Sequence, residues 1–281
     1  MNQFWLSAIP DLIKKLKEKN PLVHHLTNYV TVNDCANVTL AIGASPIMAD
    51  SQSEVAEIVA IAQSLVINIG TLNEQTASSM LVAAKAANHN QIPVILDPVG
   101  IGASTFRTNF IRSLLEQAKT SVIRGNASEI ARLVGREIEN KGVDASSADL
   151  TRNLQDRSQI VQAAATKFNC IVAMTGDIDL VADKAKVVTI ENGNWLLSKI
   201  SGTGCMCSSL IGAYCGVADN PDYFLAVIAG LLTMSIAGEL AADKNYNSND
   251  YSSFRIELIN QISKLTPDQI LNHARLREIQ R

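Results

Sequence analysis

Four consecutive residues, Gly202-Thr203-Gly204-Cys205, combine a glycine-rich turn with a thiol at the start of an apolar segment. The segment Cys205–Tyr214 is predicted to be a helix, so the turn would open that helix. The first backbone N–H groups of a helix are free, and together with the helix dipole they attract anions. Glycines also let a phosphate approach the backbone closely. The sequence therefore predicts an anion-binding site at this junction, with Cys205 beside it.

A lone G-x-G turn is more often a plain helix start, but here several predicted strands also end in polar residues. Asp97 follows one strand, Arg124-Gly125-Asn126 and then Glu129 follow another, and Thr175-Gly176 follow a third. In an open parallel sheet the carboxyl ends of the strands share one edge, and ligands bind there. These residues are therefore expected along one polar crevice.

Familiar nucleotide and hydrolase motifs are missing from the sequence. There is no G-x-x-x-x-G-K-[ST] phosphate loop, and neither Gly100-x-Gly102 nor Gly202-x-Gly204 is completed to a dinucleotide fingerprint. There is no H-E-x-x-H zinc helix and no G-x-S-x-G nucleophile elbow. A phosphate site late in the chain, at a helix start, indicates a way of binding phosphate that differs from these motifs.

The elements that must position these residues alternate between short β-rich runs and longer helical patterns. Such alternation predicts right-handed crossovers and a mostly parallel sheet in a single α/β domain spanning residues 1–281. Five apolar runs are typical of strands covered on both faces, and three more polar ones of a meander at the sheet edge. The runs are Ser45–Met48, Leu65–Ile69, Pro93–Leu96, Ser121–Ile123 and Ile171–Met174, then Leu180–Ala182, Val187–Glu191 and Trp195–Ser198. The helical patterns are Val32–Ile42, Ser53–Gln63, Asn73–Asn90, Ala127–Val134, Leu150–Phe168, Gly204–Tyr214, Tyr223–Asp243, Ser252–Lys264 and Pro267–Asn272.

Composition excludes several classes of protein. With 47% hydrophobic and 18% charged residues among 281, the chain can bury enough apolar surface to fold. A formal net charge of −3 gives no basic surplus, so nucleic acid is not an expected partner. Two uncharged runs, Tyr223–Gly238 and Ile200–Ala218, are too short or too polar to span a bilayer and are expected as core helices. Five cysteines without a disulfide or zinc spacing indicate reduced thiols and a cytoplasmic protein.

Six segments, in a fixed order, resemble the ribokinase-like superfamily and, within it, the hydroxyethylthiazole kinases of thiamin biosynthesis. They are Val23–Thr31, Gly43–Met48, Asp97–Gly100, Arg124–Glu129, Thr175-Gly176 and Gly202–Cys205. The resemblance spans nearly the whole chain and implies a ribokinase-like three-layer sandwich with helices on both faces of the sheet. It further implies ATP-dependent phosphorylation of the primary hydroxyl of 4-methyl-5-(2-hydroxyethyl)thiazole, with Mg²⁺. A homotrimer with the thiazole pocket at the subunit interfaces is implied as well.

By this resemblance Met48, Asn28 and Gly202 bind the thiazole. The polarizable thioether of Met48 suits a flat, sulfur-containing ring, although most methionines simply fill the core. Asn28 would bond the ring nitrogen or the hydroxyl, or else serve as a turn residue. The neighbouring pair His24 and His25 would point apart in an extended segment and is interpreted as structural.

By the same resemblance, residues at the strand ends bind the nucleotide and its metal ion. Arg124, Thr175 and Asn126 would bind ATP. An arginine that ends a buried strand needs an anionic partner, either a phosphate or a carboxylate of Glu129 or Asp97. Glu129 and Asp97 match the magnesium region, and otherwise they are simple caps. Because Mg²⁺ uses only one or two carboxylates and keeps several waters, a sparse site is expected.

Cys205 occupies the position where most of the superfamily carries an aspartate base, and it follows the thiazole kinases in this respect. A thiol at a helix N-terminus is expected to have a lowered pKa, so a thiolate base beside the acceptor hydroxyl is the hypothesis. Phosphoryl transfer through a loose transition state depends mainly on positioning, so a weak base suffices. Gly202, Thr203 and Gly204 would form the anion hole for the transferred phosphoryl group.

Three alternatives stay open. A related kinase acting on hydroxymethylpyrimidine, or an ADP/ATP-dependent dehydratase of the same fold, would usually carry aspartate where Cys205 stands. A thiazole sensor without catalysis would have little reason to keep Asp97, Arg124, Glu129 and Thr175.

Overall fold

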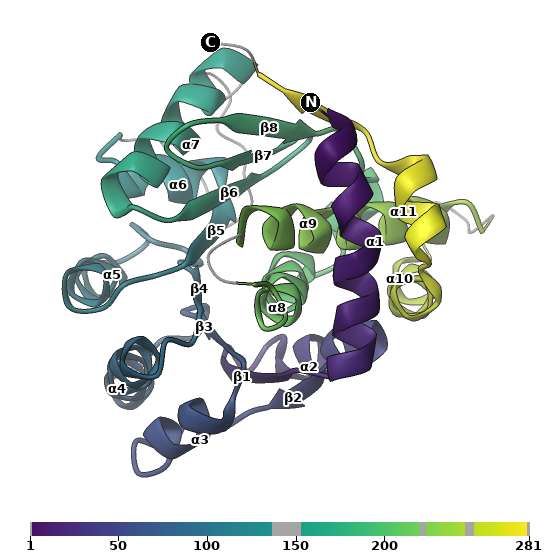
Figure 1. Cartoon of the computed structure of the whole chain (residues 1–281). Helices are drawn as coiled ribbons and strands as arrows, with labels where there is room; N and C mark the ends of the chain where they lie inside the picture. The colour runs from purple at the N-terminus through teal and green to yellow at the C-terminus, as the bar shows by residue number, and fades with distance from the viewer. Residues whose placement is uncertain (1, 137–152, 220–222, 245–249, 280–281) are drawn as a thin grey trace.

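A continuous sheet runs through the middle of the protein (Figure 1). The computed structural model describes residues 2–136, 153–219, 223–244 and 250–279. Within these ranges nine strands pair in the order β2-β1-β3-β4-β5-β6-β7-β8-β9. They are β1 (Leu22–Leu26), β2 (Ser45–Ile47), β3 (Ser64–Asn68), β4 (Val94–Asp97), β5 (Val122–Asn126), β6 (Ile171–Thr175), β7 (Asp179–Ala182), β8 (Val187–Ile190) and β9 (Leu276–Glu278). Pairing is parallel from β2 through β6 and antiparallel from β6 through β9.

Helices cover both faces of this sheet and give three layers (Figure 1). One face carries α3 (Val55–Ile61), α4 (Glu74–His89), α5 (Thr105–Gln117), α6 (Ala127–Leu133) and α7 (Leu154–Phe168). The other carries α1 (Asn2–Lys19), α2 (Val32–Ile42), α8 (Thr203–Cys215), α9 (Tyr223–Ala242), α10 (Tyr251–Lys264) and α11 (Pro267–His273). The mostly parallel sheet with helices on both faces is thus confirmed.

Each inner strand supplies side chains to two separate cores. In β3, Leu65 and Ile67 pack in the cluster with α3 and α4, while Val66 between them packs in the cluster with α8 and α9. Successive side chains of a strand point to opposite faces, so a strand covered on both sides needs an unbroken apolar run. This is why β3 to β6 were predictable from their apolar runs.

The predicted strand Trp195–Ser198 is wrong, because these residues lie in the 3₁₀ helix η1 (Trp195–Lys199). Asn194 begins this helix: its Oδ1 accepts a hydrogen bond from Leu196 N at 3.0 Å, and its carbonyl accepts one from Leu197 N. The edge of the antiparallel meander is completed instead by β9, which comes from the end of the chain and pairs with β8. Local sequence does not reveal such a distant partner.

The sequence patterns also do not predict β1, which lies inside the sheet between β2 and β3. Its histidines interrupt the apolar run, yet both are buried. A ring nitrogen of His24 pairs with Ala49 O at 2.7 Å, and one of His25 pairs with Val23 O at 3.0 Å. Burial lowers the pKa of His24, and that of His25 to about 3, so both rings are neutral at pH 7. Their structural interpretation agrees with this placement. The helices α1 and α5 were likewise not predicted.

The helix α9 is long and apolar enough to cross a membrane by length and composition, but 83% of its most apolar 18-residue stretch is buried inside the protein. It packs against α8, α10 and α1, as a core helix does. The predicted helix Leu150–Phe168 is observed from Leu154, and residues 150–152 lie outside the described residues.

Candidate active site

The turn Gly202-Thr203-Gly204 opens α8 at the carboxyl edge of the sheet, as predicted. Gly202 has a left-handed backbone with φ of 89°, and no side chain caps the helix. A methyl group at Gly202 would lie 2.3 Å from Thr31 Cγ2, so only glycine fits. The first intrahelical hydrogen bond runs from Met206 N to Gly202 O. The N–H groups of the first turn therefore have no intrahelical acceptor and are available to an anion.

Arg124, at the end of β5, lies against this helix start. Its Nη1 is 2.4 Å from where a methyl group on Gly204 would be, so the missing side chain lets the guanidinium reach the backbone. Its Nη2 donates to Thr175 Oγ1 at 2.5 Å, and its Nη1 lies 3.7 Å from Asp97 Oδ2. Burial by itself would lower the pKa of Arg124, but Asp97 and weaker negative neighbours raise it, so the side chain is charged. A positive charge and free N–H groups thus face the same space.

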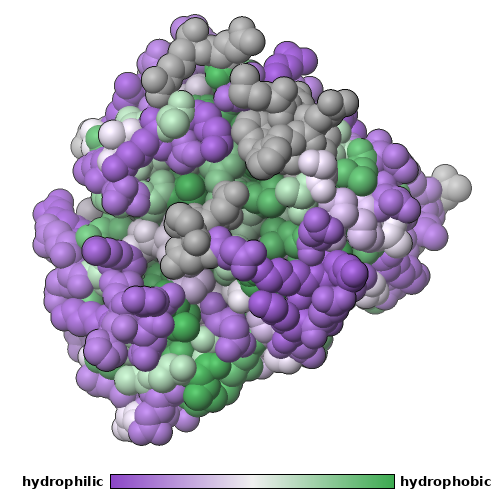
Figure 2. Space-filling view, in the orientation of Figure 1, coloured by the Kyte–Doolittle hydropathy of each residue, from purple (hydrophilic) through white to green (hydrophobic). Residues whose placement is uncertain are grey.

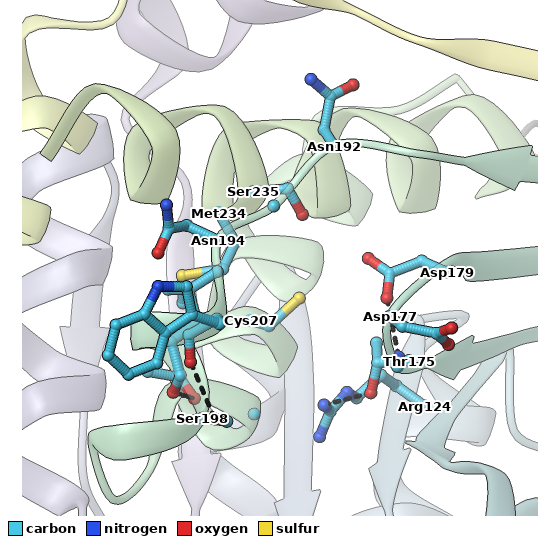
Figure 3. Close-up of a pocket in the computed structure, with 16 residues that line it drawn as sticks. Arg124, Thr175, Asp177, Asp179, Asn192, Asn194, Ser198, Cys207, Met234 and Ser235 are labelled. Atoms are coloured by element: carbon cyan, nitrogen blue, oxygen red, sulfur yellow. Dashed lines mark hydrogen bonds between the residues drawn. The ribbon is translucent and has the colours of Figure 1, made fainter. Parts of the chain in front are cut away.

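That space is a cavity of about 600 Å³. Figure 3 shows Arg124 and Thr175 on one side of it and Asn194 and Ser198 on the other. Four of the predicted site residues line this cavity, namely Arg124, Thr175, Thr203 and Gly204. The other residues around the cavity come from the β6–β7 turn, the β8–η1 connection, η1, α8 and α9: Gly176, Asp177, Asp179, Asn192, Gly193, Asn194, Trp195, Leu197, Ser198, Cys207, Met234 and Ser235.

Cys205 is bonded not to this cavity's residues but to a cluster of buried amides. Asn28 Nδ2 lies 3.3 Å and Asn68 Nδ2 3.2 Å from Cys205 Sγ. Asn28 Nδ2 also donates to Asn68 Oδ1 at 3.0 Å, and Asn68 Nδ2 to Asp97 Oδ2 at 2.8 Å. Ser208, one turn further along α8, donates to the same carboxylate oxygen at 2.8 Å. We call Asn28, Asn68, Asp97, Cys205 and Ser208 the amide–thiol cluster.

Backbone donors fix which way the two amides of this cluster point. Asn28 Oδ1 accepts from Thr31 N at 3.1 Å, and Asn68 Oδ1 accepts from Gly70 N at 2.9 Å. A backbone N–H can only donate, so both carbonyl oxygens must face these groups. Both NH₂ groups therefore face Cys205, and its sulfur is a hydrogen-bond acceptor.

The expectation of a lowered pKa for Cys205 is wrong. Burial raises the pKa of its thiol, and the nearby Asp97 carboxylate raises it further. Hydrogen bonds from Thr31 and Asn28 and the charge of Arg124 act in the opposite direction but do not outweigh these effects. Withdrawal of water from the thiolate dominates over its place at a helix start.

Asp97 is fully buried and keeps one oxygen unused. Asn68 and Ser208 both donate to Oδ2, whereas Oδ1 has no hydrogen-bond partner among the described residues. Burial raises the pKa of Asp97, and the Arg124 guanidinium works against that shift. A buried carboxylate oxygen without a partner is costly, so it marks a place where a ligand would be stabilised.

Glu129 and Asn126, in contrast, are occupied with each other. Asn126 Oδ1 accepts from Glu129 N at 2.9 Å and Glu129 Oε2 from Asn126 N at 2.8 Å, a capping box at the start of α6. The second carboxylate oxygen accepts from Gly100 N at 2.9 Å. Neither residue lines the cavity. Across residues 2–136, 153–219, 223–244 and 250–279, no group of three or more His, Cys, Asp or Glu is placed to hold a metal ion.

Met48, like Glu129 and Asn126, does not line the cavity. It follows β2 at the edge of the sheet and is half-buried. Near the amide–thiol cluster, Tyr29 and Val30 follow Asn28 and are 79% and 60% exposed. Figure 2 shows that apolar surface gathers in the middle of one face, between two polar margins.

Sequence reasoning missed Asn68 and Ser208. Asn68 is the last residue of an otherwise apolar strand, and a polar side chain at the carboxyl end of a buried strand is a signal that would have found it. Ser208 offers no such signal, because its role depends on α8 packing over the end of β4.

The architecture has a ribokinase-like fold. A solved ribokinase-like superfamily protein from Enterococcus faecalis V583 superposes with a TM-score of 0.61 at 12% identity, covering 91% of this chain and 95% of that chain. At such low identity the likeness shows the fold alone, and it confirms the predicted fold class.

Closer relatives give the family. The sequence model described as the hydroxyethylthiazole kinase family matches residues 13–268. A hydroxyethylthiazole kinase from Clostridium tetani is 52% identical over 251 residues, which is 89% of this chain and 90% of that protein. The solved hydroxyethylthiazole kinase from Pyrococcus horikoshii OT3 has a TM-score of 0.86 at 34% identity and covers 98% of this chain and 100% of that chain. The chain therefore belongs to the hydroxyethylthiazole kinase family and is a kinase.

Proposed function

We propose that this enzyme transfers the γ-phosphoryl group of ATP to the primary hydroxyl of 4-methyl-5-(2-hydroxyethyl)thiazole, a step of thiamin biosynthesis or salvage. The observation that carries the proposal is the position of the α8 start. The cavity with Arg124 lies on one side of this helix start, and the amide–thiol cluster with Cys205 lies on the other. A phosphoryl donor and an alcohol acceptor would meet across this helix start.

The donor side supplies positive charge where negative charge develops. Arg124 and Thr175 would bind the ATP phosphates, and the free N–H groups of Gly202–Gly204 would form the hole for the transferred group. In a loose transition state the protein need not form covalent bonds to the transferred group. Hydrogen-bond donors aligned with that group are therefore the main catalytic contribution. Asn126 would act behind them, through its cap on α6.

The acceptor side positions the hydroxyl. We assign the thiazole to Met48, Asn28 and Gly202, with its hydroxyl beside Cys205 Sγ. The P–O bond to this hydroxyl forms as the bond from the γ-phosphorus to the bridging oxygen of ADP breaks, and the hydroxyl proton passes to the thiolate of Cys205. Burial raises the pKa of Cys205 and keeps this thiolate scarce, but a small contribution from the base suffices when the proton leaves late.

A sparse magnesium site fits the residues present. Asp97 has a spare buried oxygen, which suits a carboxylate ligand, while both oxygens of Glu129 already accept N–H groups. Mg²⁺ takes one or two carboxylates together with waters and phosphates. We therefore assign the ion to Asp97, with Glu129 contributing through water. Bound there, Mg²⁺ would neutralise charge on the ATP phosphates.

We also propose a homotrimer with each thiazole pocket completed at a subunit interface. Tyr29 and Val30 leave large apolar side chains in solvent directly after Asn28, and Leu40 of α2 is 58% exposed. Exposed apolar groups next to a binding residue are typical of a surface that a second subunit covers. Sedimentation velocity of Val30→Asp tests this: dissociation with loss of thiazole affinity supports it, and an unchanged species opposes it.

The remaining assignments follow from the same observations. One sheet built from strands between residues 22 and 278 supports a single domain. All five cysteines are free, which suits the cytoplasm. We expect no nucleic-acid or membrane partner.

The decisive experiment measures ADP release by the purified protein with Mg-ATP, with and without the thiazole alcohol. ADP formation that requires the thiazole, with a phosphate ester as product, supports the proposal. Hydroxymethylpyrimidine is the matched acceptor control. Three results would contradict the proposal: turnover with the pyrimidine alone, consumption of a hydrated nicotinamide nucleotide, or thiazole binding without ADP formation. They would indicate a pyrimidine kinase, a dehydratase or a thiazole sensor, respectively.

A further inference from the structure

Trp195 exposes a large aromatic side chain at the cavity. It is 57% exposed, although tryptophan is usually well buried, and it lines the same cavity as Arg124. The sequence holds only two tryptophans, the other being Trp5 in α1. Exposing an indole forfeits the burial free energy that its large apolar surface would supply, so its position calls for a partner.

The cavity has two chemically different sides. Arg124, Thr175 and Gly204 form a side suited to phosphates, and Asp177 and Asp179 lie next to it. The opposite side, formed by η1, the connection before it and part of α9, has no charged group among its described lining residues. These are Asn192, Gly193, Asn194, Trp195, Leu197, Ser198 and Met234. Figure 3 shows that Asn194, Ser198 and Met234 lie on the opposite side of the space from Arg124 and Thr175.

The backbone that carries Trp195 is held on both flanks. Gly193 N donates to Glu239 Oε1 at 2.7 Å, and Asn192 Nδ2 donates to His273 O at 2.9 Å. Ser198 Oγ donates to Trp195 O at 2.7 Å. These hydrogen bonds hold the backbone turn without a ligand, so the turn itself costs little entropy to order on binding.

We infer that Trp195 is the platform on which the base of the bound nucleotide stacks, with the Nδ2 group of the neighbouring Asn194 facing the base edge. The inference rests on the proposed use of ATP and specifies how this chain recognises the non-phosphate half of that substrate. An indole offers the largest aromatic face among side chains, and stacking is tolerant of base identity. Trp195 therefore contributes affinity for nucleotides in general rather than choice among purines.

The test uses fluorescence and calorimetry on the full-length protein. In a Trp5→Phe background Trp195 is the single tryptophan, so its emission reports directly on the cavity. ATP, ADP and GTP are expected to quench it, and inorganic tripolyphosphate to quench it far less. In Trp195→Leu the Kd values for ATP and GTP should rise about tenfold to a hundredfold. Tripolyphosphate affinity should stay unchanged, and Trp195→Phe should restore most of the nucleotide affinity.

Phe106→Leu is the matched control, since Phe106 is an exposed aromatic residue outside the cavity lining. Equal ATP affinity in wild type and Trp195→Leu would overturn the platform while the kinase assignment stands. So would parallel losses of ATP and tripolyphosphate affinity, or dissociation of the assembly in this variant, because these indicate a structural role. A wild-type protein that neither binds ATP nor forms ADP would overturn both proposals.

Discussion

The two sides of the α8 start are built in opposite ways. On the cavity side, Arg124 and the start of α8 border open space, and Trp195 is largely exposed. On the other side, Asn28, Asn68, Asp97 and Cys205 are bonded to one another inside the protein. The groups on the cavity side can therefore bind a charged ligand. On the other side, internal hydrogen bonds link the side chains, so a change in one side chain affects its neighbours.

Removing the charge on the cavity side should have the largest effect. Arg124→Ala is expected to lower kcat/KM for ATP by about a hundredfold to a thousandfold, because a preorganised donor to the developing charge is lost. Arg124→Lys keeps the positive charge but loses the planar, forked guanidinium, so its kcat/KM should lie between those of wild type and Arg124→Ala. Steady-state kinetics with Arg112→Ala, an exposed arginine on α5, as control measures this. A loss below threefold would remove Arg124 from the phosphate site.

Breaking the amide–thiol cluster should cost stability as well as activity. Asn68→Leu removes one of the two acceptors of Asn28 Nδ2 and takes one donor from Asp97 and one from Cys205. We expect the free energy of unfolding to fall by about 2–4 kcal/mol and kcat to fall about tenfold. Urea unfolding and kinetics are compared with Asn109→Leu on the exposed side of α5. Normal stability with normal kcat would show that the cluster does not act as a unit.

Asp179 is a buried carboxylate that lines the cavity, so its ionisation makes the stability of the protein depend on pH. Burial raises its pKa from 3.8 to about 6. The folded protein therefore holds this proton more tightly than the unfolded chain. The stability it contributes is complete below about pH 3.8 and is lost as the pH rises through about 6.

Asp179→Asn keeps the acceptor for Gly176 N and removes the charge. We expect this variant to be more stable than wild type at pH 7.5 by at most about 3 kcal/mol, with the difference shrinking towards pH 4. Urea unfolding at several pH values measures this, with the exposed Asp11→Asn as control. An unchanged pH slope would contradict the raised pKa.

The smallest effect concerns the turn between the two sides. Gly202→Ala should lose about 1–2 kcal/mol of stability for its positive φ, plus a steric cost against Thr31. Gly135→Ala isolates the backbone part, since Gly135 has φ of 79° and nothing within 4 Å of an added methyl group.

The Thr31→Ser change removes the clashing methyl and keeps the hydroxyl that donates to Asn28. The double variant Gly202→Ala/Thr31→Ser should therefore recover the steric part of the lost stability, as measured by thermal unfolding. If it recovers nothing, the contact between Gly202 and Thr31 does not determine the choice of glycine.

The comparison also separates what was predictable from what was not. The cavity side depends on Arg124, Thr175 and the Gly202–Gly204 turn, and each stands at a strand end or helix start that local patterns reveal. The acceptor side depends on Asn68 and Ser208, which meet Asp97 only because separate elements pack together. Trp195 was misassigned to a strand because a helix of five residues has too little periodicity to identify.

By itself, the sequence determined the inner strands β3 to β6, the helix behind the Gly202–Gly204 turn, and the family. These follow from unbroken apolar runs and from residue types that few other designs need. Only the tertiary structure decided that β1 enters the sheet despite two histidines, that β9 completes its edge, and that burial raises the pKa of Cys205. All three depend on which distant groups exclude water, because desolvation and long-range pairing are properties of the packed chain.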